Sequence, residues 1–274
     1  MLEISWRSSS NQWSCRMITA NLMGRLGNQM FQIAAAYSLA IDNDDNAVFP
    51  LIPQGTIPTA AEQLFYLSTV LNNVTYGYDF SWIKSAYKEN SFSYSSIPYQ
   101  KDMMIDGYFQ SEKYFAHNSY FIKKLFSANE YIESRLEKYA SICTEEFAAI
   151  HVRRGDYVSQ SDTHTNLAEN EGYYQKVLNS FSNKTKVIFS DDIPWCVNVF
   201  GEDCVYIANE NDVVEMFLFS KIPNKAIANS SFSWWAAWLG EENSKEIIAP
   251  DKWFGPKNSH LDTSDIIPVR WTKL

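Results

Sequence analysis

The feature that most constrains the fold is a regular alternation of short apolar strands and helices after residue 146. Strands are predicted at 147–152, 186–190, 204–207, 225–228 and 246–249, with helices near 171–182, 211–220 and 232–240. Strands that alternate with helices indicate a parallel, doubly wound sheet. Such sheets bind ligands beyond the carboxyl ends of their strands. The polar clusters of this half all follow strands, so we expect them to gather at one site.

A second α/β unit is predicted nearer the N-terminus. Residues 17–23 have the pattern of a short buried strand, residues 24–28 form a glycine-rich turn, and residues 29–41 carry apolar side chains at helical spacing. Strand, turn and helix in this order open a Rossmann-like unit. Without a GxGxxG pattern, a tight turn needed only for packing explains the glycines equally well. A strand at 103–109 and helices over 112–126 and 128–140 are predicted to follow, whereas 50–100 has the composition of a long surface connection.

Together the two units predict an α/β protein of two Rossmann-like domains that face a cleft. We expect an N-terminal extension at 1–16, a first domain at 17–143 and a second at 144–274, with the boundary within 141–146. Residues 1–16 are polar and lack the apolar core of a signal peptide, so they are a loosely held extension or Met17 is the natural start. No apolar run reaches 18 residues, which predicts no transmembrane segment.

Charge and cysteine usage narrow the class of partner. A net charge of −9 argues against nucleic acid or an anionic membrane as the main partner, so an anionic ligand needs a local basic site. The four cysteines show no CxxC spacing and the four histidines are scattered, which predicts no metal site. Free thiols are typical of a reducing compartment, and we expect a cytoplasmic protein.

The local basic site is predicted at His151-Val152-Arg153-Arg154-Gly155-Asp156-Tyr157, directly after the apolar strand at 147–150. Guanidinium groups bind phosphate oxygens two at a time, so the Arg pair indicates a diphosphate site. The alternative is a structural ion pair between one arginine and Asp156. An Arg-Gly-Asp adhesion signal is disfavoured, because that role needs an exposed flexible loop.

Three further polar positions follow strands or interrupt an apolar helix. Asp191 and Asp192 end a strand, where they can bind a ribose or a base edge or can cap the next helix. The segment Asn229-Ser230-Ser231-Phe232 opens a helix and favours phosphate contact over capping alone. Glu215 lies on an otherwise apolar helix, which is costly unless the acid is paired. Guanine N–H groups or a Lys or Arg side chain would satisfy it.

Five motifs in order carry a family resemblance that extends from Met17 to Trp271. They are MGRLGNQMFQIAAAYSLA at 23–40, GYFQSEKYF at 107–115, HVRRGDYV at 151–158, FSDD at 189–192 and IANSSFSWWAAWL at 227–239. With these motifs the chain resembles the inverting, GDP-fucose-dependent fucosyltransferases, and most closely the bacterial α-1,2-fucosyltransferases of glycosyltransferase family 11.

The resemblance implies a GT-B fold with an acceptor-side N-terminal domain, a GDP-fucose-binding C-terminal domain and no metal or other cofactor. It implies that His151 and Glu215 contact guanine and that Asn28 lies beside the reacting centre. Arg153, Arg154, Ser230 and Ser231 would hold the diphosphate. The remaining donor-site residues that we expect are Gly24, Arg25, Gly27, Asp191, Asp192, Asn229 and Phe232. Two positions depart from the common family pattern: Arg25 stands where a glycine is usual, and Glu215 where Asp is usual.

The implied reaction is a direct displacement of GDP from fucose by an acceptor hydroxyl, with a terminal galactose of an oligosaccharide, attacked through O-2, as the expected acceptor. Arg154 is expected to stabilise the charge on the departing phosphate. Asp156 is the nearest candidate base, Glu169 and Glu171 are others, and weak or absent base catalysis is also open. The competing predictions are a different sugar nucleotide, another fucosyl linkage, or a non-catalytic sugar- or nucleotide-binding module.

Overall fold

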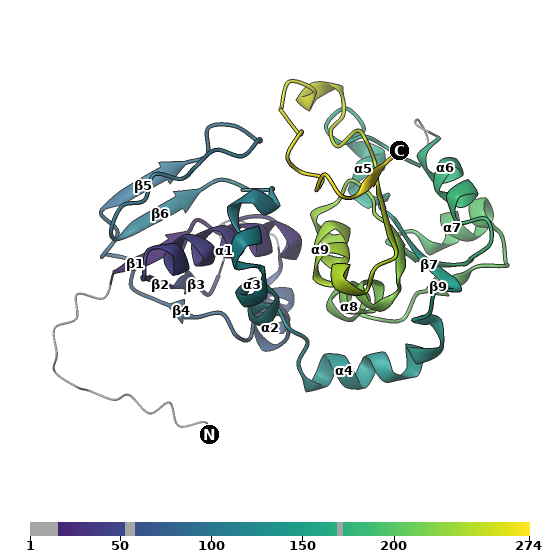
Figure 1. Cartoon of the computed structure of the whole chain (residues 1–274), viewed down its shortest axis with the longest axis horizontal. Helices are drawn as coiled ribbons and strands as arrows, with labels where there is room; N and C mark the ends of the chain where they lie inside the picture. Colours follow the sequence, from purple (N-terminus) through teal and green to yellow (C-terminus); the bar gives the residue numbers. More distant parts are fainter. Residues whose placement is uncertain (1–15, 53–57, 169–171) are drawn as a thin grey trace.

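The computed structural model describes residues 16–52, 58–168 and 172–274, and they form two parallel sheets side by side (Figure 1). The first sheet has the order β2-β1-β6-β5. Its strands are β1 Met17–Ala20, β2 Asn46–Ala47, β5 Ser85–Lys88 and β6 Met103–Asp106. A small parallel pair, β3 Phe49–Pro50 and β4 Tyr76–Gly77, accompanies it. The predicted first α/β unit is therefore confirmed.

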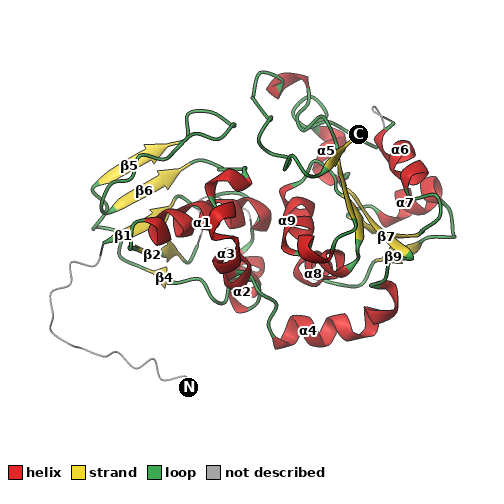
Figure 2. Ribbon diagram, viewed as in Figure 1, coloured by secondary structure: helices red, strands yellow, loops and turns green. Residues whose placement is uncertain are grey.

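Helices of this half pack on the first sheet and connect it to the second (Figure 2). They are α1 Leu26–Asp42, α2 Ala60–Ser68, α3 Ser119–Leu125 and α4 Glu130–Leu136, with 3-10 turns at Glu112–Tyr114, Ala116–Asn118 and Glu137–Ile142. The single helix predicted over 112–126 is wrong in its first part. Phe115, whose φ of −147° lies outside the helical range, separates two 3-10 turns there. Its buried ring contacts the tryptophans of the second half instead.

The region predicted as a surface connection, residues 50–100, contains regular structure in its described part. Besides α2 it holds β5, which pairs in parallel with β6 along Ser85–Lys88 and forms the edge of the first sheet. The sequence Ser-Ala-Tyr-Lys lacks an apolar run because an edge strand is only half buried. Backbone pairing with β6 forms this strand where side-chain pattern gives no signal.

The second sheet has the order β12-β11-β10-β7-β8-β9, with all strands parallel. Its strands are β7 Phe147–Val152, β8 Thr185–Ser190, β9 Val205–Ile207, β10 Asn224–Ala226, β11 Glu246–Ala249 and β12 Thr272–Lys273. The helices are α5 Gly155–Ser159, α6 Tyr173–Ser180, α7 Ile193–Phe200, α8 Asp212–Lys221 and α9 Ser231–Leu239, with 3-10 turns at Glu241–Asn243 and Pro256–Asn258. The predicted alternation is confirmed, and among the described strands of this sheet only the short β12 lacked a sequence signal.

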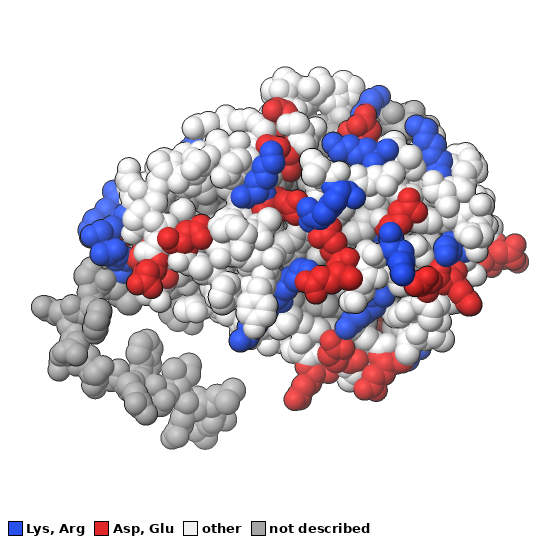
Figure 3. All heavy atoms as spheres, viewed as in Figure 1, with Lys and Arg blue, Asp and Glu red and all other residues white. Residues whose placement is uncertain are grey.

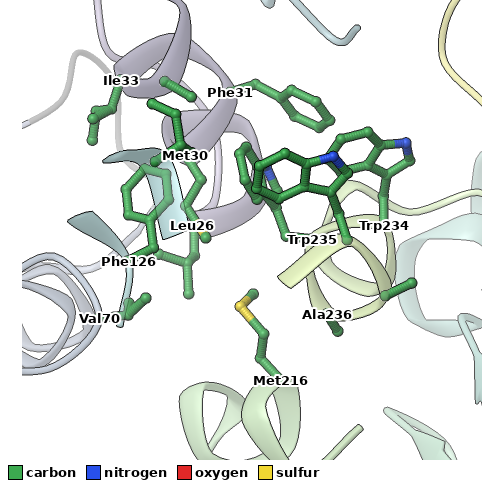
Figure 4. Packing of buried hydrophobic residues seen from close by; sticks show 14 of the residues in the cluster. Leu26, Met30, Phe31, Ile33, Val70, Phe126, Met216, Trp234, Trp235 and Ala236 are labelled. Carbon is green, nitrogen blue, oxygen red and sulfur yellow. The ribbon is translucent and has the colours of Figure 1, made fainter. Parts of the chain in front are cut away.

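One hydrophobic core joins the two halves through α1 and α9, which lie side by side between the sheets (Figure 1). Phe31 of α1 packs against Trp234 and Trp235 of α9, with ring centroids 4.5 and 5.0 Å apart (Figure 4). Phe115 stacks on Trp235 at 5.2 Å. The tryptophan pair is fully buried, and its partners come from the other half of the chain.

The outer surface has no single dominant charge on the face in Figure 3, where acidic and basic side chains are interspersed over the second half. No helix of the described residues is long and apolar enough to cross a membrane. Cys143, Cys196 and Cys204 are free thiols, while Cys15 and nearly all of the predicted extension lie outside the described residues.

Candidate active site

A cavity of about 810 Å³ lies between the two halves at the carboxyl ends of the second sheet's central strands. All predicted site residues except Arg154 and Asp192 line it. These lining residues are Gly24, Arg25, Gly27, Asn28, His151, Arg153, Asp156, Asp191, Glu215, Asn229, Ser230, Ser231 and Phe232. The strand-end clusters of the sequence therefore share one space, and the glycine-rich turn of the first half closes it from the other side.

Two helix N-termini meet in the middle of the cavity. A Cβ atom on Gly27, at the start of α1, would lie 2.6 Å from the backbone carbon of Ser231 and 2.8 Å from the backbone nitrogen of Phe232, at the start of α9. Glycine is required there because backbone meets backbone. Ser230 is the N-cap residue of α9, yet its side chain makes no capping hydrogen bond. The free N–H groups and positive dipole ends of both helices make this point an anion site.

The two adjacent arginines point to different places. Arg153 lines the cavity with 23% of its side chain exposed, and it pairs with Asp156 and Asp191 at 2.6 and 2.7 Å. Arg154 is buried, donates from Nε to Asp192 at 3.0 Å and lies over the Trp195 ring at 4.1 Å. Arg154 is not among the residues that line the cavity, since Asp192 and Trp195 hold its side chain, and its expected role at the departing phosphate stays a prediction.

Asp192 and Asp191 also have different roles. Asp192 caps α7, where its Oδ1 accepts the backbone N–H of Trp195 at 3.1 Å, and this bond together with Arg154 lowers the pKa of its carboxyl. The capping alternative therefore describes Asp192, which lies outside the cavity lining. Asp191 faces the cavity and accepts the backbone N–H of Arg154 at 2.9 Å. A Cβ on Gly155 would lie 2.6 Å from Asp191 Oδ2, so the glycine after the Arg pair makes room for this carboxylate.

Asn229 holds the cavity wall together. Its Nδ2 donates to the carbonyls of Thr165 and Trp253 at 3.0 and 2.8 Å, and its own carbonyl accepts the Tyr157 hydroxyl at 3.0 Å. With its amide hydrogens used by two loops, Asn229 supports the site chiefly by fixing those loops.

His151 is a buried imidazole at the end of β7. Burial, with the nearby charge of Arg153, lowers its pKa to about 3, so the ring is neutral at pH 7. Its Nδ1 is buried and has no hydrogen-bond partner among the described residues. The Phe232 ring lies 5.3 Å away, centroid to centroid. An unpartnered ring nitrogen in a cavity wall is available for a ligand.

Glu215 lies at one end of the cavity together with two other acidic residues. We call Glu210, Asp212 and Glu215 the acidic end. Burial, reinforced by Asp212, Glu210 and Asp191, raises the pKa of Glu215 to about 8. Among the described residues no Lys or Arg pairs with it, so the structural alternative for this acid is wrong. Asp212 accepts the Tyr66 hydroxyl at 2.6 Å, and Glu210 is held by Arg135, Lys138 and Tyr139.

Asn28 lies at the first half's edge of the cavity, where its Oδ1 accepts a hydrogen bond of 2.8 Å from Gln110 Nε2. Gln110 belongs to the motif at 107–115 but was not predicted as a site residue. Arg25 is exposed and lies 3.9 Å from Glu62. Asp156 is held by Arg153, as the structural alternative for the pair predicted, although that arginine still lines the cavity.

The sequence missed further lining residues. They include Tyr66, Asp212, Phe92, Tyr108, Tyr157, His164 and Phe254. Most of them lie in loops, where no periodicity marks them. Glu169 and Glu171 lie outside the described residues. No cluster of three or more His, Cys, Asp or Glu side chains fit for a metal ion is present in 16–52, 58–168 and 172–274.

Two parallel sheets with a cavity between them at their strand ends define a GT-B glycosyltransferase. The fold is similar to that of the NodZ α-1,6-fucosyltransferase soaked with GDP-fucose, with a TM-score of 0.51, 12% identity and coverage of 90% of this chain and 98% of that one. The chain belongs to glycosyl transferase family 11, whose model matches residues 2–273. The predicted family and fold are both confirmed.

Two relatives show which activities occur among proteins that are similar in sequence to this chain. An alpha-1,2-colitosyltransferase of Escherichia coli is 26% identical over 94% of this chain and 99% of its own length. The galactoside alpha-(1,2)-fucosyltransferase 2 of Oryctolagus cuniculus is 25% identical over 81% of this chain and 67% of its own length.

Proposed function

We propose that this chain transfers L-fucose from GDP-fucose to O-2 of a terminal β-galactoside, with inversion at the anomeric carbon and without a metal ion. Residues 17–143 form the acceptor side and 144–274 the donor side in this proposal. The observation that carries it is that Arg153 lines the same cavity as the N-termini of α1 and α9, which touch each other at Gly27 and Ser231. A diphosphate requires such a concentration of cationic and N–H groups.

The guanine base fits the acidic end. The Glu215 carboxylate, when ionised, can accept the N1–H and the exocyclic N–H of guanine, a pattern that uracil does not offer. The neutral His151 ring and Phe232 lie at the same wall and supply an unpartnered nitrogen and a flat apolar surface. These contacts support a guanine nucleotide over other sugar nucleotides.

In the proposed step the acceptor oxygen bonds to the anomeric carbon while the bond from that carbon to the β-phosphate oxygen breaks. The bonding electrons leave with the phosphate, and attack from the opposite face inverts the centre. Arg153 and the two helix N-termini stabilise the growing negative charge, which requires no reorganisation because they are already in place. Asp156 is the proposed acceptor of the hydroxyl proton at the same wall, and its bond to Arg153 couples proton loss to the leaving group.

A second donor is favoured by one observation, the similarity to an α-1,2-colitosyltransferase. Colitose is the 3-deoxy analogue of fucose, so the same GDP contacts would hold either donor. The groups close to the sugar, Asn28 and Gln110 among them, would decide between the two by hydrogen bonding to the 3-hydroxyl.

The test measures GDP release from GDP-fucose and from GDP-colitose, with lactose as acceptor and EDTA present. We expect lactose-dependent release from GDP-fucose that survives EDTA and falls by about two to three orders of magnitude in Arg153→Ala. Arg25→Ala, which removes an exposed arginine of the same cavity, is the matched control and keeps most of the rate. Loss of activity in EDTA would contradict metal independence. GDP binding without turnover of either donor would favour a binding module.

A further inference from the structure

A row of aromatic rings leads from Arg153 to the outer end of the cavity, away from the acidic end. The Arg153 guanidinium lies 5.6 Å from the Tyr157 ring, which stacks on His164 at 4.2 Å with the planes within 5°. Phe254 follows at 6.1 Å from His164, then Phe92 at 5.0 Å from Phe254. Tyr108 ends the row, 6.2 Å from Phe92. All five rings line the cavity, and we call them the ring row.

The ring row joins both halves of the molecule. Phe92 and Tyr108 come from the first half, and Tyr157, His164 and Phe254 from the second. The row's side chains are uncharged at neutral pH, since burial lowers the pKa of His164. Polar but uncharged groups stand beside the rings, among them Gln110, Thr163 and Asn258. Such a wall fits a neutral ligand that has both an apolar face and a hydroxylated edge.

The backbone around the ring row is fixed before any ligand binds. The N–H of Gly255 donates to the Thr163 carbonyl at 3.0 Å, and the Thr165 hydroxyl donates to the Phe254 carbonyl at 2.8 Å. A Cβ on Gly255 would lie 2.6 Å from the Ser161 carbonyl oxygen, so this glycine allows the two loops to touch. On the other side, Asp265 accepts the backbone N–H of Tyr94 at 2.9 Å and ties the Phe92 loop to the second half.

We propose that the ring row is the acceptor subsite and that it binds a neutral pyranoside in the corner between Phe254 and Phe92, whose planes stand at 86°, with the apolar face of the sugar stacked on one ring and its edge against the other. This inference rests on the proposed function, because it assigns the second substrate of the same cavity. The C–H face of a β-galactoside is flat and apolar, and its hydroxyls lie at the rim, which matches rings flanked by amides and hydroxyls. The row begins at Arg153, so a sugar on it would lie next to the proposed leaving group.

The kinetic test compares ring-removing variants with ring-keeping ones. Phe254→Leu and Phe92→Leu keep apolar volume but lose the flat ring, whereas Phe254→Tyr and Phe92→Tyr keep it. Tyr120→Ala removes a highly exposed ring on α3, outside the cavity lining, and is the control. We expect the leucine variants to raise the KM for lactose by about tenfold, and the tyrosine variants by less than about threefold. The KM for GDP-fucose and the GDP dissociation constant should stay unchanged in all of them.

A leucine variant with an unchanged KM for lactose would overturn the assignment, as would an equal rise in the KM of both substrates. Saturation-transfer NMR separates this failure from failure of the proposed function. If the wild-type protein releases no GDP, lactose and methyl β-D-galactopyranoside are tested for binding to its GDP complex. Signals that vanish in Phe254→Leu but persist in Phe254→Tyr support the subsite without turnover. Absence of signals with the wild type overturns it.

Discussion

The two ends of the cavity are opposite in chemistry although they share one space. At the acidic end, Glu210, Asp212 and Glu215 offer carboxyl groups whose charge and protonation depend on burial and partners. At the other end the ring row offers flat apolar surfaces without formal charge. Directional hydrogen bonds discriminate strongly between bases, whereas stacking tolerates related sugars. Under the proposed function, this difference predicts strict base specificity at the acidic end and an acceptor specificity at the ring row that exchange of loops can alter.

The largest effect is expected where the two ends meet. In Gly27→Ala the new Cβ atom would meet the Ser231 and Phe232 backbone at 2.6 to 2.8 Å, so α1 and α9 must separate. We expect the free energy of unfolding to fall by about 1–3 kcal/mol. The kcat/KM should fall by about two orders of magnitude, because the anion site loses its alignment. Chemical denaturation and GDP-release kinetics measure both. Wild-type kinetics in Gly27→Ala would contradict the close contact.

The next effect should be confined to the acidic end. Glu215→Gln replaces an acceptor of two N–H groups by an amide that can accept from only one side. We expect GDP affinity to weaken by about tenfold to a hundredfold, the range for hydrogen bonds to a charged group. The KM for lactose should not change. Isothermal titration calorimetry with GDP measures the loss, and Glu133→Gln on α4, outside the cavity lining, serves as the control. An equal rise in the KM for lactose would contradict separate roles for the acidic end and the ring row.

The pH dependence of GDP binding sharpens the comparison further. Burial, with Asp212, Glu210 and Asp191 nearby, raises the pKa of Glu215 to about 8 in the free protein, so the acid is mostly protonated at pH 7. Guanine binds the ionised form, so binding below pH 8 must release this proton. GDP affinity should therefore rise from pH 6 to 8, by at most about tenfold per pH unit, and level off above 8. Calorimetry in buffers of different ionisation enthalpy counts the released proton. The contribution should disappear in Glu215→Gln, and its persistence there would assign it to another group.

The smallest effect is expected from Arg25. Its ion pair with Glu62 is 3.9 Å long and exposed, so Arg25→Gly should change the free energy of unfolding by less than about 1 kcal/mol. At low salt the lost positive charge should raise the KM for GDP-fucose by about threefold, and 0.5 M NaCl should remove the difference through screening. An effect that persists at high salt would mean that Arg25 contacts the donor directly.

Sequence patterns predicted the second half of the fold closely because its buried strands are short apolar runs bounded by polar ends. The strand at 147–152 is β7 without any shift in its bounds, and the polar ends of the strands meet as parallel topology requires. The same patterns could not say which arginine faces the cavity. Arg153 and Arg154 are neighbours of equal chemistry, and their directions are set by Asp191, Asp192 and Trp195, which lie on another strand and helix.

The ring row could not be predicted from the sequence, for a different physical reason. Four of its five rings lie in loops and the fifth, Tyr157, lies on the short helix α5, and none repeats with the period of a strand or a helix. The Phe254 loop is fixed to the His164 loop by the backbone bond from Gly255 to Thr163 and by the close contact at Gly255, and the Phe92 loop is tied to the second half by Asp265. Such contacts depend on the assembled fold and leave no local signature. β5 escaped prediction similarly, since pairing with β6 and not its composition makes it a strand.

The shared core around Phe31, Trp234 and Trp235 has a consequence for engineering. Chimeric enzymes are usually built by exchanging whole N-terminal and C-terminal halves at the connection between them. Here that cut would divide a packed aromatic cluster and leave Phe31 and Phe115 facing tryptophans shaped for other partners. A chimera should therefore exchange smaller segments. The loops that carry Phe92 and Phe254 can be exchanged as surface segments, whereas α1 and α9 must come from the same parent protein.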